Sequence, residues 1–248
     1  MKTKKLFFDI ETSPNIGSFW SAGYKKDIPY ENIIKERAII CICYKWEGEK
    51  QVYSLTWDKN QDDKSLLKEF IKVANTADEL IGHNGDSFDL PWIRTRCLYH
   101  GVPMFPKYST LDTLKKARYY FNFNSNTLNY IANYLNLGGK KQTSLDLWKR
   151  IFLHKDDKAL DYMVKYCKQD VILLEKVYAK FAPYIDSSVH HGVANGKNKC
   201  SCPHCASTNT SISKIRYTSL GSKKIQLQCK DCSKYNTVSE STYNSCNK

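Results

Sequence analysis

The segment KKLFFDIETS, residues 4–13, joins an apolar run typical of a buried strand to two carboxylates, Asp9 and Glu11. Successive side chains of a strand point to opposite faces, so these carboxylates project to the same side, about 6.6 Å apart along the strand. Two carboxylates at this spacing repel each other, and burial increases the cost unless a cation lies between them. A divalent metal ion removes the repulsion. The alternative is a strand end whose acids face water or pair with Lys4 or Lys5.

The patterns that follow predict more strands and then helices. AIICICYKW (38–46) and QVYSLTWD (51–58) are β-branched and aromatic runs, which predict two strands joined by the turn EGE. Residues 64–74 have apolar positions three and four apart, which predicts a helix, and ELIGHN predicts a short strand. The later patterns are helical, the longest from about 156 to 182. This order predicts an α/β domain with a mixed sheet.

The composition indicates one ordinary domain and a small second one. The chain has 248 residues, 42% of them hydrophobic, so it can bury a real core. We expect the α/β domain to occupy residues 1–186, the aperiodic segment 187–199 to be a linker, and residues 200–248 to form the second domain. No run approaches the roughly 20 apolar residues that span a membrane, and the lysine-rich start meets Asp9 too early for a signal peptide. We therefore expect a cytoplasmic protein without a membrane partner.

A second group of polar residues lies in GHNGDSFDLPWIRTR, residues 82–96, which follows a predicted strand and opens a helix. Asp89 is expected near the helix N-terminus, where the dipole and the free N–H groups favour a carboxylate. The alternative is that Asp86, Ser87 or Asp89 only caps the helix.

A third group lies in YCKQDV, inside the longest predicted helix. Tyr166 and Asp170 are four residues apart, so a phenol and a carboxylate face the same side of the helix. The alternative is a surface Asp170 paired with Lys165 or another base, and Tyr166 packed in the core.

Together, FDIET, HNGDSFD and YCKQD, in this order and at these separations, resemble the DEDD superfamily of 3′-to-5′ exonucleases. The resemblance is to its tyrosine-containing branch, found in the proofreading domains of family-B DNA polymerases and in stand-alone phage and bacterial relatives. It covers about residues 4–183, where DTLKKAR and SNTLNYIANYL also look like the family. It implies an RNase H-like fold, with a mixed sheet flanked by helices.

The resemblance also implies roles for individual residues. The expected metal-binding carboxylates are Asp9, Glu11, Asp89 and Asp170. Tyr166 is expected to orient the attacking water. The histidine branch of the superfamily would need His at the position of Lys165. Asn84 matches the motif asparagine and is expected to shape the turn, and Asp112 is expected to be a helix N-cap.

The chemistry implied by this set is phosphodiester hydrolysis with two Mg²⁺ or Mn²⁺ ions about 3.5 to 4 Å apart. One ion generates the nucleophile from water, and the other stabilises the leaving 3′-oxygen. The expected activity is 3′-to-5′ hydrolysis of single-stranded or frayed ends, with DNA favoured over RNA. An RNA-directed or structure-specific nuclease with the same site is one alternative, and a non-enzymatic nucleic-acid-binding protein with an inert nuclease fold is another. Proofreading would require a separate polymerase or another replication or repair protein as partner.

Six of the ten cysteines lie in residues 200–248, and four of them form CPHC and CKDC. Two Cys-x-x-Cys pairs can place four thiolates on one Zn²⁺ in a closed tetrahedral site, which resembles a zinc ribbon. The predicted zinc ligands are Cys202, Cys205, Cys229 and Cys232. Cys200, His204 and Cys246 are nearby competitors, and a redox pair is the alternative to zinc.

The charge balance of 38 Lys and Arg against 25 Asp and Glu gives a net charge of +13, which favours a polyanionic partner such as nucleic acid. In the cysteine-rich tail, basic side chains alternate with an aromatic ring, as in surfaces that contact nucleic-acid backbones. The candidate contacts are Lys214, Arg216, Tyr217, Lys223 and Lys224. The alternative is a ribbon surface that docks on the catalytic domain or on a protein partner.

Overall fold

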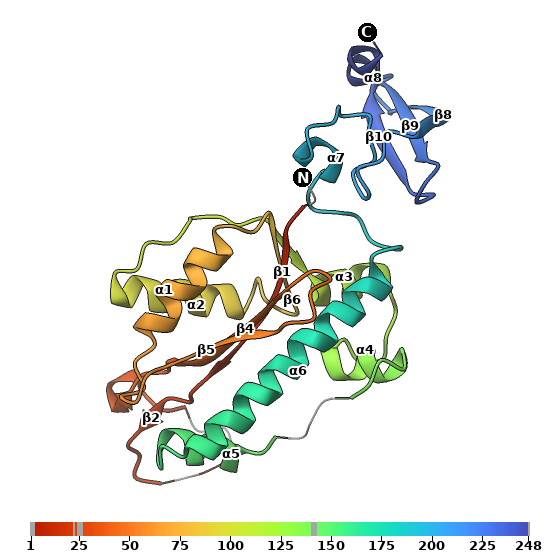
Figure 1. The fold of residues 1–248 in the computed structure, drawn as a ribbon. Coiled ribbons are helices and arrows are strands. Elements are labelled where there is room, and N and C mark those ends of the chain that lie inside the picture. The colour runs from red at the N-terminus through yellow and green to blue at the C-terminus, as the bar shows by residue number, and fades with distance from the viewer. Residues whose placement is uncertain (1–2, 22, 24–26, 140–142, 248) are drawn as a thin grey trace.

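A computed structural model describes residues 3–21, 23, 27–139 and 143–247. The larger domain is built on a five-stranded mixed sheet in the order β5-β4-β1-β6-β7 (Figure 1). The central strand β1 (Lys5–Thr12) pairs antiparallel with β4 (Ile39–Trp46) and parallel with β6 (Glu79–Gly82). The outer strands are β5 (Tyr53–Thr56), antiparallel to β4, and β7 (Thr110–Asp112), parallel to β6. The predicted α/β fold with a mixed sheet is confirmed.

Helices cover both faces of this sheet (Figure 1). On one face lie α1 (Lys64–Ala74) and α2 (Asp89–His100), and on the other α6 (Asp157–Phe181) crosses β1 and β4. The other helices of this domain are α3 (Thr113–Tyr120), α4 (Leu128–Tyr134) and α5 (Leu145–Phe152). The pair β2 (Ile16–Gly17) and β3 (Ile33–Lys35), with the 3-10 turn η1 (Tyr30–Asn32), is an addition that the sequence patterns did not predict. Within the described ranges, no helix is long and apolar enough to cross a membrane.

The two faces of β1 meet different helices. Phe7 packs edge-on against Tyr178 of α6 at 5.4 Å between ring centroids, whereas Phe8 packs against Phe70 of α1 at 5.6 Å. Because side chains alternate along a strand, Asp9 and Glu11 share the face of Phe7 and point toward α6. The carboxylates therefore lie in the C-terminal half of β1, on the face that α6 covers.

The proposed alternative partner of these carboxylates is engaged elsewhere. Lys5 forms an ion pair with Glu47 at 2.9 Å, at the start of the strand. Of the two lysines considered as salt-bridge partners of Asp9 and Glu11, Lys4 and Lys5, the second is therefore paired with Glu47.

The C-terminal domain is a three-stranded antiparallel sheet in the order β10-β9-β8. Its strands are β8 (Thr210–Tyr217), β9 (Lys223–Cys229) and β10 (Tyr235–Ser239), and α8 (Glu240–Cys246) follows them. The buried core of this domain consists of Cys200, Ile225 and Leu227 among the described residues. So small a core indicates that the domain needs another source of stability, such as a metal ion.

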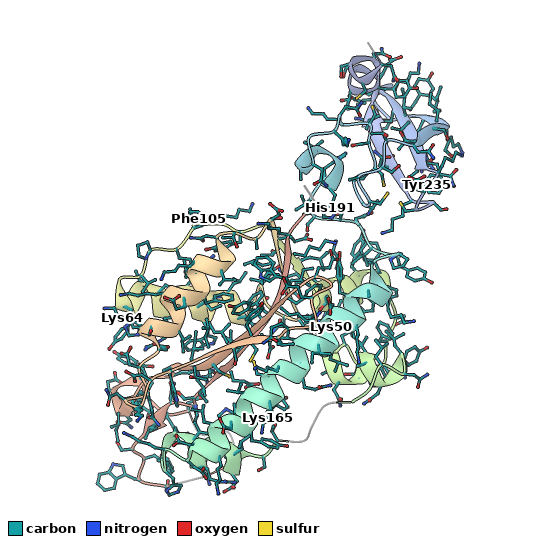
Figure 2. The ribbon with its side chains drawn as sticks, in the orientation of Figure 1. Lys50, Lys64, Phe105, Lys165, His191 and Tyr235 are labelled. Carbon is teal, nitrogen blue, oxygen red and sulfur yellow. The ribbon has the colours of Figure 1, made fainter. Side chains whose placement is uncertain are left out.

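The segment 187–199 contains a short helix, α7 (His191–Ala194), which its aperiodic sequence did not predict. Buried His191 contacts Thr3 Oγ1 through Nδ1 at 2.7 Å and Ser187 Oγ through Nε2 at 3.0 Å. The main-chain N–H of His191 also donates to Pro203 O in the ribbon at 3.0 Å. Figure 2 shows His191 at the junction of the two domains. This part of the predicted linker is therefore packed between them.

A lysine of the ribbon reaches the C-terminal end of α6. Lys234 Nζ donates to the carbonyl oxygens of Ala182 and, at 3.2 Å, of Ile185. These carbonyls follow the last turn of α6, where a helix leaves acceptors without internal partners. Burial lowers the pKa of Lys234, and burial together with the nearby charge of Lys234 lowers the pKa of His204 to about 4. A neutral His204 thus accompanies the lysine in this contact.

Candidate active site and zinc ribbon

Three of the predicted carboxylates converge between β1 and α6. One oxygen from each of Asp9, Glu11 and Asp170 lies within 4.8 Å of the other two. Asp9 and Glu11 are half-buried on β1, and Asp170, on α6, is 3% exposed. Carboxylate oxygens are the ligands that Mg²⁺ and Mn²⁺ prefer, and three like charges so close together favour a bound cation. The donor set therefore fits a hard divalent metal ion.

The fourth carboxylate, Asp89, lies outside this group of three. It is the first residue of α2 and is 4% exposed, and its Oδ1 accepts a hydrogen bond from the main-chain N–H of Ile10 at 3.1 Å. The N-cap of α2 is Phe88, and α2 has no side-chain capping bond, so Asp89 does not simply cap its own helix. Burial raises the pKa of Asp89 to about 7; the nearby charge of Asp112 adds to the shift, and the N–H of Ile10 opposes it. Asp89 is thus attached to the strand segment that carries the other two carboxylates.

Tyr166 lies one helical turn before Asp170. Its ring is partly buried and packs against the main core. Both residues face the same side of α6. Lys165, labelled in Figure 2, is exposed on this helix, in contrast to the buried Asp170. The interpretation of Asp170 as a surface residue is therefore wrong, and Tyr166 has both an exposed part and a packed part.

The turn before α2 is held by Asp112. Asn84 has a left-handed backbone with φ of 70°, and its N–H donates to Asp112 Oδ1 at 2.9 Å. Asp112 also accepts from the N–H of Asp86 at 3.3 Å and from that of Leu114 at 2.9 Å. The predicted N-cap role of Asp112, at α3, is confirmed. Its second task is to fix the turn that delivers Asp89 to β1.

A cleft of about 430 Å³ opens beside Glu11. Its walls include Phe88, Arg37 and Trp148. The Arg37 guanidinium lies over the ring of Trp92 at 4.9 Å, and Trp148 Nε1 donates to Thr12 O at 3.0 Å. The motifs of the sequence did not predict a role for Arg37 or Trp148. The sequence does place Arg37 directly before the predicted strand 38–46. In the structure the start of that strand, β4, pairs with the end of β1 that carries Glu11, so the position of Arg37 could have been noticed.

The four predicted zinc ligands converge in the ribbon. Their sulfur atoms all lie within 4.8 Å of one another, with Cys202 and Cys232 at 3.6 Å and Cys205 and Cys229 at 3.6 Å. Zn–S bonds of about 2.3 Å at tetrahedral angles place sulfurs about 3.8 Å apart, so the donor set fits Zn²⁺. The competitors Cys200, His204 and Cys246 lie outside this group. The four-cysteine cluster and the small antiparallel sheet are those of a zinc ribbon.

The five candidate contacts on the ribbon divide between two faces of its sheet. Lys214 is opposite Gln226 and Arg216 is opposite Lys224, whereas Tyr217 is opposite Lys223. Directly opposed residues share a face, and neighbouring residues of a strand do not, so Tyr217 and Lys223 lie on the other face from Lys214, Arg216 and Lys224. Lys223 also pairs with Glu240 at 2.8 Å. We call the set Lys214, Arg216 and Lys224 the basic face.

Comparisons with known proteins agree with this architecture. The sequence profile described as RNase_H superfamily matches residues 33–182. A DNA polymerase of Thermococcus hydrothermalis is 31% identical over 109 residues, which are 40% of this chain and 6% of that polymerase. The structure of the family B DNA polymerase of Pyrobaculum calidifontis is similar with a TM-score of 0.57 and 17% identity, covering 73% of this chain and 25% of that chain. The chain therefore spans only a small part of either polymerase. By its sheet order, its helices and the profile that matches most of the larger domain, the chain belongs to the RNase H superfamily.

Proposed function

We propose that the chain is a metal-dependent 3′-to-5′ exonuclease that hydrolyses phosphodiester bonds at the ends of single-stranded nucleic acid, with DNA as the favoured substrate. The observation that carries the proposal is the convergence of Asp9, Glu11 and Asp170 under α6. Membership of the RNase H superfamily and the likeness to polymerases support it. The net charge of +13 supports a nucleic acid as substrate.

The residues that would hold two Mg²⁺ or Mn²⁺ ions are Asp9, Glu11 and Asp170, with Asp89 as the fourth. Such ions, when bound, lower the pKa of a water molecule and stabilise charge on the leaving oxygen. Asp89 is a poor metal ligand while it is protonated, and burial raises its pKa to about 7 in the metal-free protein, so a cation would have to displace this proton. The hydrogen bond from Ile10 to Oδ1 holds the Asp89 carboxyl group in place beside β1.

Tyr166 would orient the attacking water. Its partly buried ring packs against the core, which fixes the ring, and it lies on the same side of α6 as Asp170. A fixed phenol beside a metal-bound carboxylate can hold a water in line with a phosphorus atom without taking its proton.

The terminal nucleotide would enter the cleft beside Glu11. Phe88 and Trp148 offer aromatic surface for a base, and single-stranded nucleic acids bind by stacking on such rings. Arg37 Nε is buried without a hydrogen-bond partner among the described residues, and a phosphate oxygen would satisfy it. The zinc ribbon would add phosphate contacts through the basic face.

The test is a cleavage assay on 5′-labelled single-stranded DNA and RNA with Mg²⁺ or Mn²⁺, with and without a chelator. A ladder that shortens from the 3′ end, disappears with chelator and disappears with Asp9→Asn supports the proposal. Internal cuts would replace it by a structure-specific nuclease. Tight binding without cleavage would replace it by a nucleic-acid-binding protein with an inert nuclease fold.

A further inference from the structure

Three buried cysteines of the larger domain converge at a point that the proposed function does not use. The sulfur atoms of Cys41, Cys43 and Cys167 all lie within 4.8 Å of one another, and each residue is 0% exposed. Cys41 and Cys43 come from β4 and Cys167 from α6. Cys41 and Cys43 are two residues apart on the same face of β4, and the packing of α6 on the sheet adds Cys167. We call these residues the thiol group.

The thiol group is adjacent to the carboxylates on the same face of the sheet. In the β1–β4 pair, Asp9 is directly opposite Cys43, and Glu11 is directly opposite Cys41. Opposed side chains share a face, so both pairs lie under α6. Cys167 Sγ approaches Asp9 Oδ2 at 3.5 Å and Asp9 O at 3.5 Å. The thiol group and the group of three carboxylates are thus in contact at Asp9.

Ordinary packing explains a single buried thiol, because a free cysteine behaves as a small apolar residue. Cys97 of α2 is an example: it is 1% exposed and lies outside every cysteine cluster among the described residues. Three sulfurs within 4.8 Å of one another are a different arrangement, because ligands around one metal ion have this spacing. The four ribbon sulfurs, which also lie within 4.8 Å of one another, show the same spacing in this chain.

We propose that the thiol group is a binding site for a soft, thiophilic metal ion, next to the carboxylate site for hard cations. Thiolates select soft ions such as Cu⁺, Zn²⁺ and Cd²⁺, whereas carboxylates select Mg²⁺ and Mn²⁺. Binding forms bonds from the three sulfurs to the ion and releases the thiol protons to solvent. The site is closed to water, which suits sulfur ligands that tolerate burial. This inference does not rest on the proposed nuclease activity.

The experiment titrates the full-length chain with Cd²⁺ in the absence of other divalent ions and follows thiolate-bound cadmium by cadmium NMR. The wild type should give two such signals, one from the ribbon and one from the thiol group. Cys43→Ser and Cys167→Ser should each remove the same signal, and Cys232→Ser should remove the other. Cys97→Ser, which removes a buried thiol outside both groups, should keep both signals.

Two results would overturn the proposal. In the first, Cys232→Ser removes every thiolate-bound cadmium signal that the wild type gives. This test does not depend on whether a variant of the thiol group folds. The other is a second signal that survives in both Cys43→Ser and Cys167→Ser. Circular dichroism of each variant, compared with that of the wild type, distinguishes the loss of a metal ligand from the unfolding of a domain.

Discussion

Asp89 accepts a hydrogen bond from the main-chain N–H of Ile10, the residue between Asp9 and Glu11, at 3.1 Å. This bond joins the first residue of α2 to the central strand at the position where the carboxylates begin to converge. Burial of this carboxyl group raises the pKa of Asp89 to about 7, although the hydrogen bond from Ile10 opposes the shift. The stability of the contact between Asp89 and Ile10 therefore depends on pH.

The contribution of Asp89 to the stability of the metal-free protein should fall as pH rises from about 4 to about 7. The folded state keeps the Asp89 proton up to about pH 7, whereas an unfolded Asp loses it near 3.8. The folded state therefore binds more protons in this window, so the contribution of Asp89 is complete below pH 4 and is lost as pH passes 7. Denaturant melts with chelator present, across this window, measure the slope. Asp89→Asn should flatten it and Asp86→Asn should not; equal slopes in wild type and Asp89→Asn would contradict the prediction.

Asp9→Asn and Asp170→Asn should each reduce hydrolysis by about 10³-fold or more while the protein stays folded, since residues that act as one unit fail together. The measurement is the initial rate on labelled single-stranded DNA with saturating Mg²⁺. Asp161→Asn is the matched control, because it removes an exposed carboxylate from the same helix, α6. Retention of wild-type rates by either of the first two variants would exclude the carboxylate group as the active site.

Cys205→Ser should abolish zinc binding by the ribbon and unfold the ribbon. The buried core of the ribbon is very small, and structural zinc contributes on the order of 10 kcal/mol to the folding of such domains. The variant should bind one zinc ion fewer per chain than the wild type, and proteolysis should remove residues 200–248 first. Cys246→Ser, outside the four-sulfur group, should retain the metal. A ribbon that resists protease after Cys205→Ser would show that zinc does not hold it together.

Lys234→Met should loosen the contact between the ribbon and α6, because the carbonyls of Ala182 and Ile185 lose their donor. We expect faster protease cleavage within 187–199 and faster amide exchange at the end of α6, with zinc still bound. Lys230→Met removes a ribbon lysine that donates to Gln228 within the ribbon, and serves as the control. Unchanged exchange in Lys234→Met would mean that other contacts dominate.

Replacing Lys214, Arg216 and Lys224 by Gln should weaken nucleic-acid binding and flatten its salt dependence. The logarithmic slope should fall by about 0.7 for each phosphate of a single strand that the protein no longer neutralises. Affinity for labelled single-stranded DNA over a series of salt concentrations measures this. Lys223→Gln is the control, since Lys223 lies on the other face and pairs with Glu240. An unchanged slope in the triple variant would leave the ribbon as a protein-docking surface.

Much of the fold was predictable because its patterns are local. The apolar spacing of α1 and the length of α6 follow from side chains three and four apart, and α1 has the predicted bounds. The cysteine pairs of the ribbon were equally local. What could not be predicted depends on tertiary contacts: α7 has no periodicity and is ordered by His191, and β2 is too short to have a pattern.

In the candidate site, too, the features that depend on local sequence were predictable and those that depend on tertiary contacts were not. The residues Asp9, Glu11 and Asp170 were recognisable by their motifs, but the position of Asp89 against Ile10 is a long-range contact. The two faces of the ribbon sheet depend on the register between β8 and β9, including an irregularity between Ile212 and Lys214. A single-residue change in register exchanges the two faces, and spacing along one strand does not reveal it.

The contact of Lys234 with the end of α6 has a practical meaning for exchanging modules between proteins. The helix that carries Asp170 is completed by a donor from the ribbon, so the nuclease-like domain with its tail removed lacks a part of its own helix end. A foreign tail grafted after residue 186 would need a donor at the same place. The border between the two units therefore crosses two hydrogen bonds, and exchanging the C-terminal unit leaves their carbonyl acceptors to water unless the new unit supplies a donor.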